Sequence, residues 1–466
     1  MADIVALLQS IAPLLSKTTL RQLSHVIFGM LVTTGRVTML GLSRWTDKGG
    51  SYGCAVRNHY RTIQRFYHTV LPWAEMMWAL FVKWIWKPVD EYILAGDEVV
   101  ASKAGKETYG LDRFFSSLEQ RPIPGLSFFT FSLVNVRERQ SYPVQTTQVV
   151  KSAEEKAASK AKAQAKKARK TAEKKKPGRP KGSKDRNKRG VVLNNGCAVR
   201  NHNELLRIQK ALRALLETIR TILSLKYIVL DGHFGNYPSA WMVRQESLHL
   251  ISKLRSDAAL YPAFEGEYRG FGRRTKYGEK IAVHQMGDKY LKETSIEGNL
   301  RTDIYQGTFY NKEFDFALNV VILLKTNLVT QAQAHVILFS TDLDLAYDTI
   351  IEFYSLRFQI EFNFRDAKQY WGLEDFMNVK ETAVTNAACL SFFMVNLSFL
   401  LRQPFRQSNP DYSIVDLKAH YHGCRYASET IKMLPQKPDA ILLADIFEQI
   451  ARLGMIHPVF EPATNA

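Results

Sequence analysis

Residues 351–376 read IEFYSLRFQIEFNFRDAKQYWGLEDF, and this stretch decides the fold that we predict for the chain. Four of its residues, Tyr354, Arg357, Glu361 and Lys368, are separated by three, four and seven positions. Because an α-helix completes a turn every 3.6 residues, the spacing predicts one helix with all four on one face or close to it. Such a face is costly to bury in an apolar core. It suits a site where a carboxylate holds a metal ion and cations hold phosphates.

Two earlier segments supply further carboxylates. YILAGDEVV, residues 92–100, is an apolar run that reaches Asp97, and KYIVLDGHFGN, residues 226–236, is another that reaches Asp231. Each pattern predicts a buried strand that delivers an acid at its end. Together with Glu361 they give three carboxylates, whose hard oxygen atoms suit Mg²⁺ or Mn²⁺. Two such ions, about 3.5–4 Å apart, can stabilise both the attacking and the leaving oxygen of a phosphodiester displacement.

The order and spacing of these residues resemble the DDE transposases of bacterial insertion sequences, in the group named after insertion sequence four. The match to the Tyr-Arg-Glu-Lys signature of that group is complete in residue type and spacing. The segments around Asp97 and from Asp231 to Asn236 resemble the strands that carry its first and second acids. The resemblance runs from about Thr33 to about Asn396, and Phe358 stands where the family often carries Trp.

The resemblance implies an α/β fold. A ribonuclease-H-like catalytic domain with a β-rich insertion would follow an N-terminal helical DNA-binding domain. The metal ligands and catalytic acids would be Asp97, Asp231 and Glu361, holding two Mg²⁺ or Mn²⁺ ions, and Tyr354, Arg357 and Lys368 would bind DNA phosphates. The implied partners are double-stranded DNA, as terminal inverted repeats and target, and a second copy of the chain that pairs two DNA ends.

Simpler interpretations exist for each segment alone. The four residues from Tyr354 could form a surface helix with an i,i+4 ion pair, and an acid after an apolar strand is often a turn residue. Glu98 rivals Asp97 as the first acid, but a strand alternates faces, so both cannot point into one site. We prefer Asp97 on the resemblance. His233 and Asn236 closely follow the second acid, and His233 could equally be a loop histidine without a role.

A chain of 466 residues predicts two to four domains. Residues 1–90 carry apolar residues at helical spacing with interspersed Arg, which suits recognition of a DNA end, although a plain helical cap on the catalytic domain is the alternative. The predicted boundaries are 1–90 for the helical domain, 91–150 and 191–250 for the catalytic domain, 151–190 for a basic linker, 251–340 for the β-rich insertion, and 341–466 for the C-terminal helices of the catalytic domain.

The net charge of +18 points to a polyanionic partner. Residues 151–190 contain 17 Lys or Arg and 4 Asp or Glu, so this segment carries most of the excess. It is rich in Ala and Lys, is helix-prone, and has no apolar face to bury. Residues 177–181, Pro-Gly-Arg-Pro-Lys, resemble an AT-hook, in which Arg179 and Lys181 would lie in a narrow A·T-rich minor groove. The alternatives are a solvated basic linker without sequence preference and a localisation-like patch.

Four scattered cysteines without a C-x-x-C pair fit a reducing compartment. The N-terminus has an acid at position 3 and no basic region, unlike a signal peptide. Residues 387–401 form the longest apolar stretch, which is too short to span a bilayer and predicts a core helix behind the catalytic helix. We therefore expect no membrane partner and a cytoplasmic, nucleoid-associated location in a prokaryote.

The heptapeptide GCAVRNH occurs twice, at 53–59 and 196–202, and each copy is flanked on both sides by the same residue. We interpret the copies as two insertions of one short DNA element, each accommodated in a surface loop. Their cysteines and histidines would make a four-ligand zinc site, but the spacing is unlike zinc fingers and the duplication explains the pairing.

These patterns together predict a cut-and-paste transposase. Within the same chemistry, the alternative is a nuclease that cuts DNA without rejoining it. From another class, the alternative is an impaired transposase remnant that acts only as a DNA-binding protein.

Overall fold

The computed structural model describes residues 2–46, 55–116, 119–157, 161, 164, 203–267, 270 and 275–457. The chain divides into two compact units. The first comprises Met1–Tyr92, Glu98–Gln148 and Phe358–Ala466, and the second comprises Ile93–Asp97 and Val149–Arg357. Two of the boundaries therefore fall directly after Asp97 and Arg357.

The second unit begins its sheet with parallel strands. β5 (Tyr227–Leu230) pairs in parallel with the first half of β1 (Tyr92–Ser102) and with β6 (His249–Leu254). All four residues of β5 are buried, as expected for an apolar run in the interior of a parallel sheet. This strand confirms the prediction that an apolar strand precedes Asp231.

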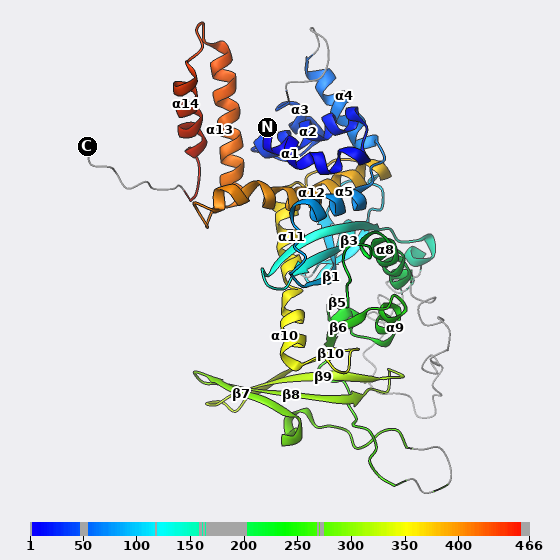
Figure 1. Ribbon diagram of the computed structural model, residues 1–466. Helices are drawn as coiled ribbons and strands as arrows, with labels where there is room; N and C mark the ends of the chain where they lie inside the picture. Colours follow the sequence, from blue (N-terminus) through cyan, green and yellow to red (C-terminus); the bar gives the residue numbers. More distant parts are fainter. Residues whose placement is uncertain are drawn as a thin grey trace, which may run out of the picture. The chain divides into compact units, whose positions relative to one another are not determined.

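Four antiparallel strands extend this sheet. In chain order they are β7 (Leu291–Glu297), β8 (Leu300–Tyr310), β9 (Ala317–Asn327) and β10 (Gln333–Ser340). Each pairs with the next, and β10 also pairs with β6, so the strands continue the sheet that starts at β5 (Figure 1). The strands predicted at 301–311, 314–326 and 334–342 are confirmed by β8, β9 and β10. Whether 251–340 is an insertion into an older domain stays a prediction.

Three longer helices complete the second unit, α8 (Asn203–Ile219), α9 (Tyr237–Gln245) and α10 (Tyr347–Leu356). α8 packs against α9, and α10 packs against strands β5, β6, β9 and β10. The buried carboxylate of Glu246 accepts hydrogen bonds from Gln209 and Arg213 of α8, at 2.9 and 2.7 Å. The helix predicted from residue 204 onward is therefore present and is held by a paired buried charge.

The first unit contains its own strands, β2 (Asp112–Ser116), β3 (Arg121–Asn135) and β4 (Gln140–Val149), together with the second half of β1. β3 lies between β2 and β1, and it also pairs with β4. From Gly125 to Asn135 every residue of β3 is buried. The strand predicted at 126–136 is confirmed.

α12 (Glu381–Arg406) is the central helix of the first unit. It packs against α4 (Ala55–His68), α5 (Trp73–Trp84), α11 (Gln359–Gln369) and α13 (Ile414–Met433). Buried Asn386 accepts a hydrogen bond from the Trp73 indole at 2.7 Å and donates to the Tyr67 carbonyl at 2.8 Å. α12 is long and apolar enough to cross a bilayer, but 89% of its most apolar window is buried, as in a core helix. The predicted core helix behind the catalytic helix is confirmed.

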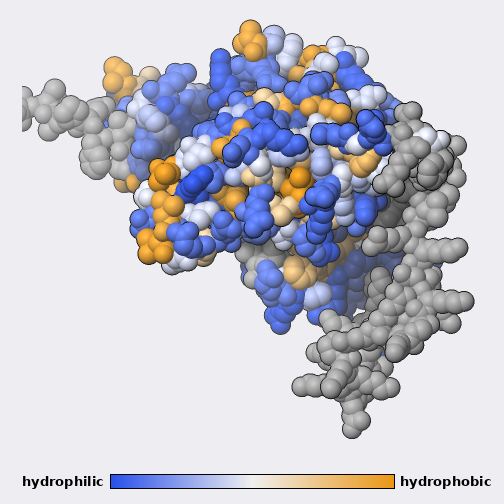
Figure 2. All heavy atoms as spheres, turned by 90° about the horizontal axis from the view of Figure 1, so that it is seen from below, coloured by the Kyte–Doolittle hydropathy of each residue, from blue (hydrophilic) through white to orange (hydrophobic). Residues whose placement is uncertain are grey.

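The remaining helices of the first unit are α1 (Ala2–Leu8), α2 (Lys17–Val32), α3 (Met39–Ser43) and α14 (Ala440–Arg452). α2 packs against α13, and α14 packs against α13. Residues 2–46 and 55–84 are thus mainly helical, as expected, and they share a compact unit with α12. That they recognise DNA stays a prediction. On the face drawn in Figure 2 hydrophilic residues predominate, and hydrophobic ones are scattered among them.

The prediction of one helix carrying all four signature residues is wrong. α10 ends at Leu356 and α11 begins at Gln359, so Arg357 and Phe358 lie between two helices. Both keep right-handed helical dihedral angles, and the Glu361 amide donates to the Phe358 carbonyl, three residues back. A switch to the tighter hydrogen-bond pattern changes φ and ψ little, so side-chain periodicity does not register it.

The loop expected for the first heptapeptide copy is also wrong in part. Ala55–His59 have helical backbone and form the start of α4. The residues are not a helix breaker, because only the leading glycine of the copy disfavours a helix. Gly53, Cys54 and the second copy lie outside the described residues, as do the side chains of 55–59, so the zinc hypothesis is not tested.

Candidate active site

Asp97 and Asp231 follow paired positions on neighbouring parallel strands. In the second unit Gly96 of β1 is in register with Leu230 of β5, so each aspartate is the next residue along its strand. Paired positions on parallel strands, about 4.8 Å apart, direct their side chains to the same face of the sheet. The sequence therefore brings two carboxylates side by side from segments that are more than 100 residues apart.

Arg357 binds the first of these acids. Its guanidinium donates from Nη1 to Asp97 Oδ2 at 2.7 Å, and the two side chains are only 14% and 21% exposed. Charge-assisted hydrogen bonds of this length are among the stronger ones in proteins, and partial burial reduces their screening by solvent. The Arg357 guanidinium carbon also lies 6.0 Å from the centre of the Tyr354 ring.

Tyr354 shares this environment within the second unit. Burial raises the pKa of its phenol above the ordinary value; Arg357 opposes the rise, and the Asp231 and Asp97 carboxylates add to it. Both acids therefore lie close enough to Tyr354 to influence its ionisation. The structure thus brings together four of the predicted residues, Asp97, Asp231, Tyr354 and Arg357.

Asp231 is fixed by its own turn. Its Oδ1 accepts a hydrogen bond from the His233 amide at 2.9 Å, and its carbonyl accepts one from Ser252 Oγ at 2.7 Å. His233 Nε2 lies 3.2 Å from Glu204 Oε1, a partner that the sequence did not indicate. Asn236 caps α9, because its side-chain oxygen accepts from the Ser239 amide at 3.1 Å. Asn236 therefore has a sufficient structural role without any part in chemistry.

Glu98 faces away from its neighbour. Ser127 Oγ of β3 donates a hydrogen bond to Glu98 Oε1 in the first unit, whereas Asp97 is bound by Arg357 in the second. This is the alternation of faces expected along a strand. The carboxylate that shares its surroundings with Asp231 and Tyr354 is Asp97, which is the choice made from the sequence.

Glu361 and Lys368 belong to the first unit, on α11. Glu361 lies in the first turn of the helix, where a carboxylate is favoured by the helix dipole. Lys368 donates from Nζ to the Val100 carbonyl at 2.6 Å and lies 3.1 Å from Glu374 Oε1. The geometry within each unit therefore leaves the assignment of Glu361 as third acid resting on the sequence.

The donor chemistry fits divalent metal ions. Asp97 and Asp231 offer hard carboxylate oxygens on one face, which Mg²⁺ and Mn²⁺ prefer. Among the residues that the structure describes, no cluster of three or more His, Cys, Asp or Glu side chains is arranged to hold a metal ion. A site of two aspartates thus matches part of the ligand set predicted from the sequence.

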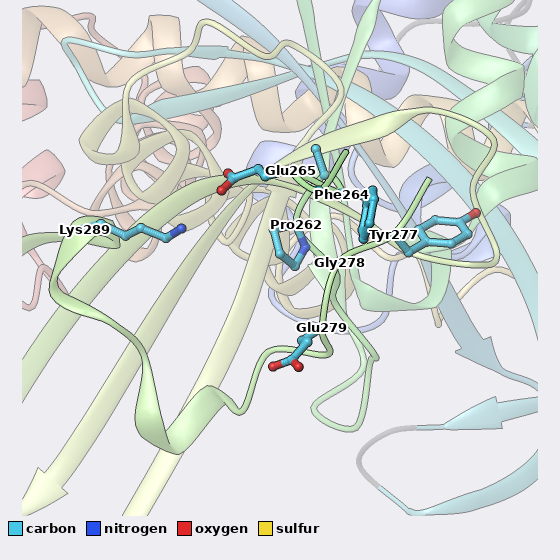
Figure 3. A pocket seen from close by; sticks show the side chains of 9 residues that line it. Pro262, Phe264, Glu265, Tyr277, Gly278, Glu279 and Lys289 are labelled. Atoms are coloured by element: carbon cyan, nitrogen blue, oxygen red, sulfur yellow. The ribbon is translucent and has the colours of Figure 1, made fainter. Parts of the chain in front are cut away.

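Other predicted residues and cavities lie elsewhere. Arg179 and Lys181 are outside the described residues. A cavity of about 430 Å³ in the second unit is bordered by Glu265, Glu279 and Lys289 among others (Figure 3). One of about 900 Å³ in the first unit is lined by cations and acids, Arg36, Lys103, Lys106, Glu107, Glu119, Arg121, Glu374 and Asp375. The described residues that line these two cavities do not include the predicted acids.

Comparison with known proteins gives the family. The sequence profile described as DDE superfamily endonuclease matches residues 10–298, which is more than half of the chain and includes Asp97 and Asp231 but not Glu361. No curated protein matches the chain. Members of such a family are nucleases that act on DNA, and they generally use divalent metal ions. On the length of this match, the chain belongs to the family of DDE superfamily endonucleases.

Proposed function

We propose that this chain is the transposase of an insertion sequence, of the group with the Tyr-Arg-Glu-Lys signature, and that it cleaves DNA ends and transfers them to a target. The observation that carries the proposal is the placement of Asp97 and Asp231 at paired strand positions beside Tyr354 and Arg357. The complete signature spacing from Tyr354 to Lys368 adds the third acid, Glu361.

Asp97, Asp231 and Glu361 are the residues that hold two Mg²⁺ or Mn²⁺ ions in this proposal. When bound, such ions activate a water or a DNA 3′-hydroxyl as nucleophile and stabilise the leaving oxygen. The proposal requires Glu361 to join the two aspartates when the enzyme acts.

Arg357 has two successive partners in this mechanism. Before the site is loaded, its guanidinium neutralises the Asp97 carboxylate at 2.7 Å. Once Asp97 serves as a metal ligand, Arg357 can turn its planar fork to a DNA phosphate, which it binds through two hydrogen bonds. The Tyr354 hydroxyl, protonated because its pKa is raised by burial, can donate a hydrogen bond to the same backbone. Lys368 provides a point charge for a phosphate.

The basic regions recruit the substrate. Residues 1–90 recognise the terminal inverted repeats, and the segment 151–190 attracts phosphates, with Arg179 and Lys181 in an A·T-rich minor groove. Two copies of the chain pair two DNA ends on double-stranded DNA. The proposed location is the cytoplasm of a prokaryote, on the nucleoid.

The duplicated heptapeptide favours a second candidate, an impaired remnant that binds DNA without cutting it. The first copy contributes Ala55–His59 to α4, among the helices assigned to DNA recognition. An insertion there can weaken end binding while leaving Asp97 and Asp231 in place.

One assay separates these functions. Purified protein is incubated with Mg²⁺, supercoiled target and labelled DNA carrying the terminal repeat, which is read from inverted repeats flanking the gene. Joined products are expected of a transposase. Cut products without joining indicate a nuclease, and retarded but uncut DNA indicates a remnant. Either of the last two results contradicts the proposed function, and the Asp231→Ala protein serves as the uncut control.

A further inference from the structure

Lys368 is held by two contacts within the first unit. Its ammonium donates to the Val100 carbonyl of β1 at 2.6 Å and lies 3.1 Å from Glu374 Oε1. Its side chain is 26% exposed. A lysine ammonium has three N–H donors, so these two contacts leave donor capacity for an anion.

Glu374 is itself fixed by the chain around it. Its Oε1 accepts a hydrogen bond from the Ser102 amide at 3.3 Å, and its carbonyl accepts one from Lys103 Nζ at 2.8 Å. The Lys103 ammonium also lies 3.6 Å from the centre of the Phe376 ring. Both the side chain and the backbone of Glu374 are therefore tied to the end of β1.

The loop that carries Glu374 is built on a special backbone position. Gly372 has φ +77°, and a Cβ there would lie 2.4 Å from the Cβ of Val37. Asp375 then donates its amide to the Gly372 carbonyl at 3.0 Å, and its carboxylate accepts the Val37 amide at 3.0 Å. The loop after α11 thus has one conformation, which returns Glu374 to the lysine six residues earlier.

We infer that Glu374 is a positioning residue that holds Lys368 in place for a DNA phosphate. The inference rests on the proposed function, in which Lys368 contacts the DNA end. Lysine has four rotatable side-chain bonds, and a free one loses that freedom when it binds. An ammonium fixed beforehand, by a carbonyl and a carboxylate that are themselves fixed, meets the phosphate without this loss.

The test is a double-mutant cycle between Lys368 and Glu374. Single-turnover cleavage of a labelled duplex carrying the terminal repeat is measured at saturating DNA, and the dissociation constant is measured in Ca²⁺. We expect Glu374→Ala to lower the cleavage rate about tenfold, with less than a threefold change in the dissociation constant. Glu374→Gln, which keeps the acceptor oxygen, should restore most of the rate. Adding Glu374→Ala to Lys368→Ala should cause no further loss.

The outcomes separate the inference from the proposed function. If Lys368→Ala slows cleavage but Glu374→Ala does not, or if the two losses multiply in the double variant, the inference is wrong and the proposed function stands. If Lys368→Ala cleaves like the parent, the lysine has no phosphate role and the inference falls with it. If the parent cuts no terminal DNA, both are overturned. The control is Glu448→Ala, which removes a carboxylate paired with Arg452 at 2.6 Å on α14.

Discussion

Asp97 and Glu98 are adjacent in the sequence and differ by one methylene, yet β1 gives them different partners. Asp97 accepts from Arg357, and Glu98 accepts from Ser127. Strand alternation decides which carboxylate shares a face with Asp231, so a substitution at each position should have a different effect.

Replacing Asp97, Asp231 or Glu361 by Ala should lower cleavage of terminal DNA by a factor on the order of 10²–10³ or more, because each removes charge that stabilises the transition state. DNA affinity should remain near that of the parent. Glu98→Ala is the matched control and should retain cleavage. Both properties are measured on the same labelled duplex. Near-parental cleavage by Glu361→Ala would refute the third acid, and loss in Glu98→Ala with activity in Asp97→Ala would reverse the first.

Lys418 makes stability depend on pH. Its ammonium is buried, donates to the Met30 and Tyr370 carbonyls at 3.2 and 3.4 Å, and has its pKa lowered by burial to about 8 from 10.5. The unfolded chain therefore binds more protons between these values, so this group makes stability rise with pH in that window. Lys418→Met should flatten the rise in unfolding free energy between about pH 7.5 and pH 9, measured with urea. The control is the exposed Lys432→Met on the same helix, and equal pH dependence in both would refute the assignment.

At the scale of elements, the loop between α11 and α12 depends on Gly372. Gly372→Ala should destabilise the protein by roughly 1–3 kcal/mol, because alanine is strained at φ +77° and its Cβ would collide with Val37. The shift should be visible in thermal unfolding. Gly287→Ala is the control, since the added Cβ meets no atom within 4 Å there. Equal melting temperatures for the two variants would show that the loop tolerates a side chain.

α4 bears on the duplicated heptapeptide. The buried side chains that its described part contributes, Ile63, Phe66 and Tyr67, all follow the first copy. Excising residues 53–60 and 196–203 should therefore give a protein at least as stable and active as the parent. Melting temperature and affinity for terminal DNA are compared for single and double excisions. A clear loss on excision would make the copies integral parts of the fold and reopen the zinc hypothesis.

For the whole molecule, the charge distribution matters more than any single contact. Residues 151–190 carry 17 of the 63 Lys and Arg. Replacing the segment by a short neutral linker should weaken DNA binding and flatten its salt dependence, since each phosphate contact on duplex DNA contributes a slope of about −0.9. Affinity is measured at several salt concentrations. Cleavage at saturating DNA should persist, and an unchanged slope would contradict the prediction.

Arg179→Ala tests the minor-groove part of the same segment. If Arg179 lies in a narrow groove, the variant should lose several-fold more affinity for A·T-rich DNA than for random DNA. The matched control is Lys170→Ala, which removes a charge outside the hook-like residues. Equal losses on both DNAs would leave only a generic basic linker.

The sequence by itself determined the strands and most of the helices. Apolar runs of four to eleven residues gave β1, β5, β8, β9 and β10, because such runs are stable when both faces are covered or when one face alternates with solvent. The order of two strand acids and a helix acid, and the spacing from Tyr354 to Lys368, were likewise readable, since they depend on local geometry alone.

Only the tertiary structure decided which side chains meet. The register of β1 and β5 places Asp97 beside Asp231, and no local pattern fixes a register between strands so far apart in the chain. The break at Arg357 and the left-handed Gly372 that returns Glu374 to Lys368 were missed for the same reason. Periodicity reports which face of an element is buried. Partners such as Glu374 and Glu204 are set by long-range packing, which the sequence encodes only through the folded chain as a whole.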